Sequence, residues 1–260
     1  MIRNTFSILN GIGEKLERRL WMEGILTWTD FIAANNIRCI SPERKAAFDW
    51  SLSTAERKLG EGDAVFFARN VRRREHWRLF EIFGKDAVYL DIETNGLPPG
   101  RGGYVTVVGF YDGYDWRCLV EGDDLTSENL RRALSGYKCL VTFYGSSFDV
   151  PFLQRSFPDV RFDIPHFDLC FAAKRLGIKG GLKRIEELFE IERDHDVKGM
   201  NGYDAVKLWE LAKRGSGEAR RLLLCYNRED TINLSKIADI LYHRLRQSTG
   251  IEEHLVCGLT

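Results

Sequence analysis

Residues 88–94 read VYLDIET, which has the length and apolar composition of a buried strand. Two acids, Asp91 and Glu93, interrupt this stretch two positions apart. Because side chains alternate between the two faces of a strand, both carboxylates point to the same face and lie side by side. Like charges at that distance repel each other, and burial makes their ionisation costlier still. The pair therefore requires compensation from elsewhere in the protein or from something bound to it.

The residues around this strand predict a mixed α/β domain. Three further β-rich runs follow it, and each ends in Gly or Asp: YVTVVGFYDG, DWRCLVEG and KCLVTFYG. Helical patterns intervene before the last run (LTSENLRRALSG) and dominate after Asp149, where they include FDLCFAAKRLG, GLKRIEELFE and a long final helix from about Gly217 to Gln247. The stretch before the first strand is helical throughout, with Ser41 as an N-cap and Pro42 in a first turn. We expect a small all-helical domain over residues 1–84 and an α/β domain over residues 85–260.

The composition predicts a globular, cytoplasmic protein. Of the 260 residues, 44% are hydrophobic, which is enough for a sizeable core, yet no apolar run reaches the length of about eighteen that spans a membrane. The N-terminus also lacks the apolar segment of a secretory signal. Since 38 basic residues balance 38 acidic ones, the net charge alone does not point to a polyanionic partner, and local clusters of charge must carry that argument. The six cysteines are scattered without a CxxC pair, so we expect neither a zinc site nor a disulfide framework.

A third acid, Asp230, lies within the apolar stripe of the long final helix. The stripe consists of residues at three- and four-residue intervals: Leu223, Tyr226, Asp230, Leu234, Ile237 and Leu241. A buried carboxylate costs several kcal/mol unless it is paired or binds a cation. Asp230 could pair with an arginine such as Arg184, could cap another helix, or could bind a metal ion. Tyr226 lies one turn earlier on the same face.

Asp149 and Asp168 are further candidate acids. Asp149 follows a β-run and a loop in TFYGSSFDVPFL and opens a helix, so taken alone it is best interpreted as an N-cap. Asp168 in PHFDLCF has the same N-cap interpretation, and His166 beside it is favoured as a core histidine over a substrate contact. The DHD at residues 194–196 has metal-like residue types but lies on a predicted loop, which argues against a metal there.

Taken together, DIET at residues 91–94, FDVPFL around Asp149 and YNRED ending at Asp230 resemble, in order and spacing, the three exonuclease motifs of the DEDD superfamily. The Tyr-x-x-x-Asp form of the third motif resembles that of the DEDDy branch. The sequence pattern of residues 86–247 is similar to that of the YprB-type predicted exonucleases. The resemblance implies a ribonuclease H-like mixed sheet flanked by helices. One departure is Tyr144, because many members have Asn at this position and use it near the substrate.

The resemblance also implies a catalytic set. Asp91, Glu93, Asp149 and Asp230 would be metal ligands, with Asp91 bridging, and Tyr226 would orient the attacking water. Four clustered carboxylates carry about four negative charges, which two divalent cations would neutralise, and hard oxygen ligands suit Mg²⁺ or Mn²⁺. Two such ions could clamp a phosphodiester.

Three stretches are candidates for holding nucleic acid. LNGIGEKLERRLWMEG resembles a helix-hairpin-helix motif, in which Gly11 and Gly13 would present backbone N–H groups to a phosphate, with Lys15, Arg18 and Arg19 nearby; a purely structural or protein-binding hairpin is the alternative. In GIKGGLKRIEEL, Lys179 and Lys183 flank a helix start, although Gly-Gly as a simple turn is the default. The basic stretch RNVRRREHWR either tracks a strand with Trp77 as a stacking platform or is a linker with Trp77 packed at the domain junction.

The sequence thus predicts a metal-dependent 3′-5′ exonuclease that acts on DNA or RNA with a free 3′ end. The substrate is expected to be single-stranded, and no membrane partner is expected. Two alternatives remain open at this point: a structure-specific endonuclease of the same fold, and a non-catalytic nucleic-acid-binding module. The complete set of acids argues against the module, because clustered carboxylates hinder phosphate binding.

Overall fold

The computed structural model describes residues 1–256 as one sheet surrounded by helices. The strands are β1 (Ala87–Thr94), β2 (Val105–Tyr111), β3 (Trp116–Val120), β4 (Cys139–Thr142) and β5 (His166–Asp168). The helices are α1 (Glu14–Met22), α2 (Trp28–Ala33), α3 (Pro42–Gly60), α4 (Ala64–Asn70), α5 (Phe80–Phe83), α6 (Ser127–Leu134), α7 (Asp149–Ser156), α8 (Leu169–Arg175), α9 (Leu182–Leu188), α10 (Gly202–Lys213), α11 (Gly217–Thr249) and α12 (Ile251–Val256). Short 3-10 turns are η1 (Ile2–Asn4), η2 (Phe6–Ile8), η3 (Arg73–Leu79), η4 (Gly84–Asp86) and η5 (His195–Val197). The predicted strands and the long final helix are confirmed.

The five strands form a mixed sheet in the order β3-β2-β1-β4-β5. Strand β2 runs antiparallel to both of its neighbours, β1 and β3, whereas β1, β4 and β5 run parallel to one another. Parallel neighbours need crossover connections, and helices α6 to α8 lie within or follow these crossovers. The α/β class with a mixed sheet flanked by helices is therefore confirmed.

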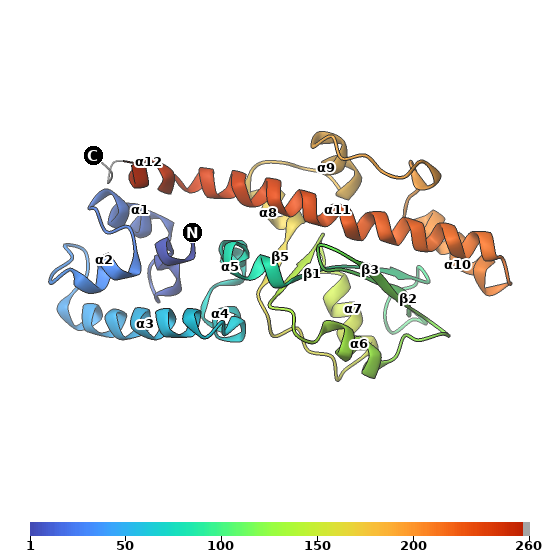
Figure 1. The fold of residues 1–260 in the computed structure, drawn as a ribbon, viewed down its shortest axis with the longest axis horizontal. Helices are drawn as coiled ribbons and strands as arrows, with labels where there is room; N and C mark the ends of the chain where they lie inside the picture. Colours follow the sequence, from blue (N-terminus) through green and yellow to red (C-terminus); the bar gives the residue numbers. More distant parts are fainter. Residues whose placement is uncertain (257–260) are drawn as a thin grey trace.

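Each face of the sheet is covered by a different set of helices. Val88, Leu90 and Ile92 pack with residues of α6 and α7 in one apolar cluster. The alternate residues of β1 face the long helix α11, which crosses the opposite face (Figure 1). Strand β1 is thus apolar on one face and carries Asp91 and Glu93 on the face toward α11, as the alternation of side chains predicts.

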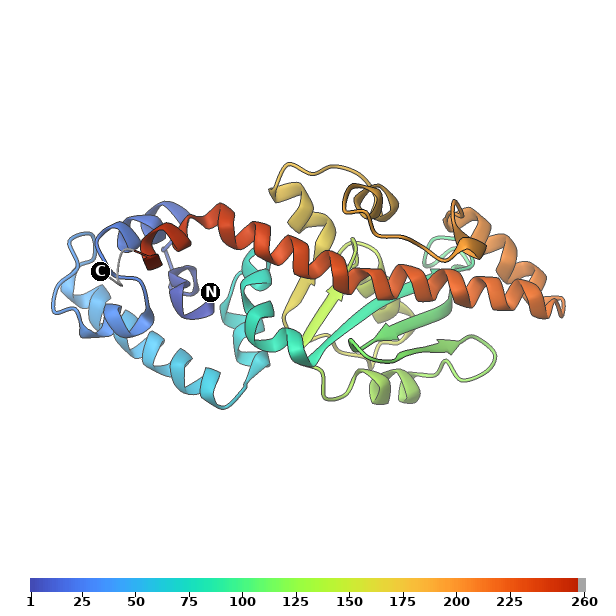
Figure 2. The same cartoon turned by 45° about the horizontal axis from the view of Figure 1, so that its top comes forward.

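Helix α11 extends beyond the sheet and joins the N-terminal helices. It is 33 residues long, and Figures 1 and 2 show it running from α10 across the sheet to α12 and α1. Its predicted stripe is buried, and Leu241 and Leu245 share one apolar cluster with residues of the N-terminal helices such as Phe6 and Trp28. This cluster spans both predicted domains, and the division at residue 84 stays a prediction.

Trp77 lies at the junction between the N-terminal helices and the sheet. It is 3% exposed and packs against Tyr242 of α11, with ring centroids 6.1 Å apart. The interpretation of Trp77 as a free stacking platform is therefore wrong, because the indole is buried in the core. Ser41 caps α3 with Pro42 in its first turn, as predicted.

Within residues 1–256, no helix is long and apolar enough to cross a membrane. The five cysteines of this part of the chain are all free thiols, and the sixth, Cys257, lies outside the described residues.

Candidate metal centre

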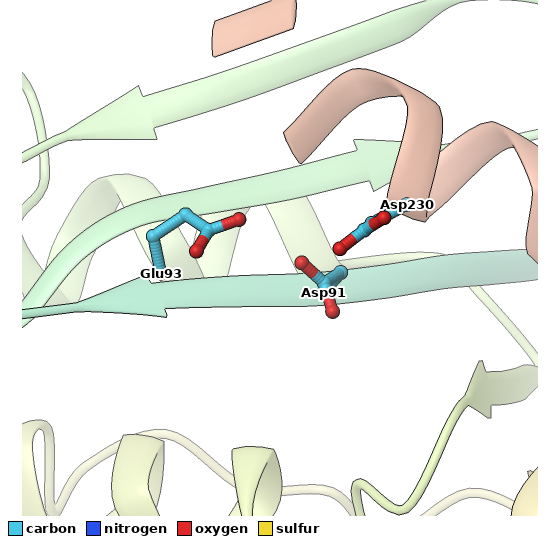
Figure 3. Close-up of side chains that lie close together, drawn as sticks. All are labelled: Asp91, Glu93 and Asp230. Carbon is cyan, nitrogen blue, oxygen red and sulfur yellow. The ribbon is translucent and has the colours of Figure 1, made fainter. Parts of the chain in front are cut away.

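Three of the predicted acids converge between β1 and α11. Asp91, Glu93 and Asp230 each offer a carboxylate oxygen, and these oxygens all lie within 4.8 Å of one another. Figure 3 shows Asp91 and Glu93 rising from β1 and Asp230 descending from α11 toward them. Two neighbouring acids of β1 and one acid from the distant helix α11 thus build one acidic group of the size that a metal ion requires.

The approach of α11 to β1 depends on Gly109. This glycine of β2 pairs with Asp91 of β1, and a Cβ atom built on it would lie 2.0 Å from Asn227 Oδ1 and 2.6 Å from Thr231 Oγ1. Because glycine has no side chain, the helix can press against the sheet at this point. Asn227 then donates from Nδ2 to Asp91 Oδ2 over 3.0 Å and fixes the orientation of that carboxylate.

The electrostatics of the group show that it lacks sufficient positive charge of its own. Burial raises the pKa of Asp91 and of Glu93 well above the usual values, and the charge of Asp230 raises both pKa values further. Glu93 is 7% exposed, and its Oε1 atom has no hydrogen-bond partner among residues 1–256. An orphaned buried oxygen near two other carboxylates is what a hard divalent cation would satisfy.

Asp149 lies next to this trio, at the start of α7. Strand β1 continues past the end of its pairing with β4 at Tyr89 and Val141, so the Ile92 amide has no strand partner on that side. Asp149 Oδ1 accepts a hydrogen bond from this amide over 3.2 Å. Burial raises the pKa of Asp149 to about 7. The prediction that Asp149 caps its own helix by side-chain hydrogen bonding is wrong, because its carboxylate turns to β1 instead.

Asp230 has a partner that the sequence did not indicate. The buried guanidinium of Arg193 contacts Asp230 and also donates to Glu186, from Nε over 2.7 Å. Asn233 donates to the same glutamate over 2.9 Å. Arg184, the predicted alternative partner, instead pairs with the exposed Glu187. Asp230 is therefore both paired with an arginine and part of the acidic trio, while Asp91 and Glu93 have no ion-pair partner in the described part of the chain.

Tyr226 and Lys183 complete the wall of the site on the side of α9. Tyr226 is 4% exposed, and burial together with the charge of Asp230 raises its pKa, so the phenol stays protonated. The Lys183 Nζ atom lies 4.9 Å from the centroid of the Tyr226 ring and has no hydrogen-bond partner within residues 1–256. Lys183 thus faces the acidic group, whereas Lys179 lies exposed on the loop before α9.

The residues of the predicted helix-hairpin-helix motif lie among the N-terminal helices. Gly11 has a φ of +81°, and Gly13 is the N-cap of α1. The element before them is only the 3-10 turn η2, so the first helix of the expected motif is short. Arg44 donates to the Asn10 carbonyl over 3.4 Å, and Lys15 and Arg18 are exposed beyond it. Arg18 also donates to the Ser248 carbonyl over 3.3 Å. The role of the hairpin in binding nucleic acid stays a prediction.

The remaining candidates have structural roles. Asp168 caps α8 by accepting from the Cys170 amide over 3.1 Å, which confirms the N-cap interpretation. His166 packs against Thr142, with 2.8 Å between Nε2 and Oγ1, and burial lowers its pKa to about 4. In the segment 194–196, Asp194 caps η5 and Asp196 pairs with Arg221.

Three residues of the site escaped sequence reasoning. Arg193 lies in an irregular segment, Asn227 is one polar residue in a helix, and Gly109 is a glycine in a strand. The last offered a signal, because an isolated glycine in a strand marks a close approach by another backbone or side chain. For Arg193 and Asn227, the spacing of residues in the sequence carried no such signal.

The mixed sheet with clustered acids on its central strand defines a ribonuclease H-like protein. A family model described as the RNase_H superfamily matches residues 88–242, and the chain belongs to this superfamily. No curated protein matches the chain by sequence.

Among solved structures, the chain is similar to Brucella melitensis NrnC bound to pGG, at 22% identity over 68% of this chain and 82% of that one, with a TM-score of 0.48. It is also similar to Brucella melitensis NrnC with bound Mg²⁺, at 20% identity with the same coverage and a TM-score of 0.47. A third similar structure is described as the apo form of the nuclease, at 21% identity over 66% of this chain and 78% of that one, with a TM-score of 0.47.

Proposed function

We propose that this protein is a metal-dependent 3′-5′ exonuclease of the DEDDy type, similar to the YprB-type enzymes, which hydrolyses DNA or RNA from a free 3′ end. The observation that carries the proposal is the convergence of Asp91, Glu93 and Asp230 within 4.8 Å on the central strand and α11. A buried group of like charges raises the free energy of the folded protein unless a cation offsets it. Its presence therefore favours a function that needs bound cations.

The donor set fits Mg²⁺ or Mn²⁺. All contributing atoms are carboxylate oxygens, and Asp149 lies beside the trio to supply a fourth group. Two such cations, when bound, would neutralise the scissile phosphate and lower the pKa of an attacking water. In this proposal Asp91, Glu93, Asp149 and Asp230 hold the cations.

The neighbouring side chains would orient the reactants. The protonated phenol of Tyr226 can donate a hydrogen bond to a water beside Glu93 and Asp230. Asn227 holds the Asp91 carboxylate in one orientation. Lys183, whose ammonium lies over the Tyr226 ring, supplies a positive charge for a phosphate oxygen. Water is the nucleophile, so no covalent intermediate forms.

Nucleic acid would also contact the N-terminal helices. Gly11 and Gly13 place the backbone of the hairpin next to Lys15 and Arg18, which suits sequence-independent phosphate binding. Truncating this segment is a poor test, because Phe6 and Trp28 are buried in the common core. Lys15→Glu tests it instead: we expect weaker DNA binding with a shallower salt dependence at unchanged stability. Lys179, exposed before α9, is the second predicted phosphate contact.

The direct test is hydrolysis of end-labelled oligonucleotides, run on matched DNA and RNA with Mg²⁺, with Mn²⁺ and with EDTA. Stepwise release of mononucleotides from the 3′ end supports the exonuclease, and Asp91→Asn should abolish it. Internal fragments would assign a structure-specific endonuclease instead. Binding without turnover under every condition would leave a non-catalytic nucleic-acid-binding module.

A further inference from the structure

An exposed pair of aromatic rings lies beside the acidic group. Tyr144 is 45% exposed and Phe171 is 46% exposed, and their rings are stacked with centroids 6.0 Å apart and an interplanar angle of 29°. The Lys174 Nζ atom lies 5.6 Å from the first ring and 5.0 Å from the second. We call these three residues the aromatic platform. Single exposed aromatics are ordinary, but a stacked pair with a shared cation is a surface that can bind a planar ligand.

The backbone at Tyr144 is held in a strained conformation. Its φ is +66°, in the left-handed region that Gly and Asn adopt easily and that bulky residues rarely occupy. Asp168 holds this conformation, because its carboxylate accepts from the Tyr144 amide over 3.0 Å and from the Ser146 amide over 3.0 Å. Strain of this kind persists where the surroundings enforce it and gathers at functional sites. A tyrosine here therefore carries a cost that an asparagine would avoid.

The sheet places the platform at the acidic group. Strand β4 pairs in parallel with β1, with Val141 opposite Tyr89, so the loop that starts after Thr142 leaves the sheet beside the part of β1 that carries Asp91 and Glu93. Neighbouring strands lie about 5 Å apart. The same loop continues directly into Asp149, whose carboxylate binds the Ile92 amide. A nucleic-acid strand whose bases stack on the aromatic platform would therefore have its end at the acidic group.

A cavity of about 660 Å³ continues from the platform toward the N-terminal helices. Phe171 and Lys174 line it on the side of α8, and Arg73 and Arg74 of η3 line it on the other side. Arg74 pairs with Glu75, but neither Arg73 nor Lys174 has a carboxylate within 4.0 Å among residues 1–256. The surface thus combines aromatic rings with two cations that form no ion pair in the described part of the chain, and the acids Glu14 and Asp168 line other parts of the same cavity.

We propose that the aromatic platform and this cavity bind single-stranded nucleic acid, with bases stacked on Tyr144 and Phe171 and phosphates at Lys174 and Arg73. The inference rests on the proposed function and deepens it, because it selects an unpaired strand as the substrate. Bases inside a duplex do not expose their faces, whereas every unpaired base has a face that an aromatic ring can stack on. Recognition is accordingly independent of sequence.

The test measures binding without cleavage, by fluorescence anisotropy of labelled oligothymidylate and oligouridylate in EDTA. The decisive variant is Tyr144→Asn, because it removes the ring and relieves the strained backbone, so the melting temperature should be equal or higher. We expect affinity to fall by roughly 5- to 140-fold for the loss of one stacked base. Lys174→Ala should reduce the slope of log affinity against log salt by about 0.7, the value for one phosphate contact on a single strand.

Tyr203→Ala is the matched control. Tyr203 is 68% exposed and has the Lys207 ammonium 4.3 Å from its ring centroid, but it lies on α10, away from the platform. Affinity should not change in this variant. Equal affinity of Tyr144→Asn and the wild type would overturn the proposal, and so would an equal loss for a duplex of the same length. Competition by polyglutamate as effective as that by oligothymidylate would reduce the surface to a general anion site and overturn the stacking.

These outcomes are separate from the test of the nuclease. If the wild-type protein binds single strands through the platform but releases no nucleotides with Mg²⁺ or Mn²⁺, the proposed hydrolysis fails and the binding surface stands. If it releases nucleotides while Tyr144→Asn retains full affinity, the platform fails and the nuclease stands.

Discussion

Gly109→Ala is the substitution that tests most directly how the fold builds the site. The added Cβ would lie 2.0 Å from Asn227 Oδ1, a distance about 1 Å shorter than side chains tolerate, and 2.6 Å from Thr231 Oγ1. Asn227 and Thr231 are fully buried on α11, so their side chains cannot move aside into solvent. Either Asn227 gives up its hydrogen bond to Asp91 or the helix moves away from the sheet.

Both outcomes have a calculable cost. Overpacking by one methyl group destabilises a core by about 1 to 3 kcal/mol, and loss of a hydrogen bond to a charged group costs about 1.5 to 3 kcal/mol. Because one or the other occurs, we expect the free energy of unfolding to fall by about 1 to 3 kcal/mol. A shift of about 1 Å between Asp91 and Asp230 should lower nuclease activity by roughly 100-fold, because catalytic groups are sensitive to displacements of that size.

The assay is urea denaturation followed by circular dichroism, together with release of nucleotides from an end-labelled strand. Gly217→Ala is the control on the same helix, because a Cβ there meets nothing within 4 Å. A second variant, Gly109→Ala with Asn227→Ala, removes the nearest clashing atoms and should regain part of the stability without regaining activity. If Gly109→Ala unfolds at the urea concentration of the wild type, the close packing of α11 on β2 is wrong.

Three further predictions concern pH, a buried ion pair and metal binding. In EDTA, the stability of the wild type relative to Asp149→Asn should fall as the pH rises from about 4 to about 7, because the pKa of Asp149 is raised to about 7 in the folded state and the folded protein holds this proton more tightly than the unfolded chain does. Arg78→Ala should lower the free energy of unfolding by about 3 to 5 kcal/mol, since it leaves Glu17 buried without an ion-pair partner in the described part of the chain and removes one partner of Glu75, which keeps Arg175. Mg²⁺ or Mn²⁺ should raise the melting temperature of the wild type but not of Asp91→Asn.

Each of these has a measurement that decides it. Thermal melts at pH 5 and pH 8 would contradict the first if the wild type became more stable relative to Asp149→Asn at the higher pH. For the second, Arg132→Ala is the control, because its pair with Glu128 is exposed and is worth less than about 1 kcal/mol; equal effects of the two substitutions would count against the buried pair. For the third, an equal rise in the melting temperature of Asp91→Asn would place the metal elsewhere.

Local patterns predicted much of the fold and three of the acids at the site. The alternation in VYLDIET placed Asp91 and Glu93 on one face, and the stripe in the last helix placed Asp230 on the face that meets them. These periodicities are local, so one sequence suffices to read them. Arg193 could not be predicted, because an arginine in an irregular segment reaches Asp230 only through the path of the chain after α9. The partner chosen in its place, Arg184, lies on the exposed side of that helix.

The long helix α11 explains why the N-terminal helices belong to the same structural problem as the site. Asp230 lies near the middle of this helix, and its C-terminal half packs through Leu241 and Leu245 into the cluster that contains Trp77. Arg246, near the end of the helix, pairs with Glu81 over 3.3 Å. Because a helix transmits displacement along its length, the position of Asp230 over β1 is fixed by Gly109 at one end of the contact and by the N-terminal helices at the other. Residues 1–84 therefore contribute to the geometry of the acidic group even where they contact no substrate.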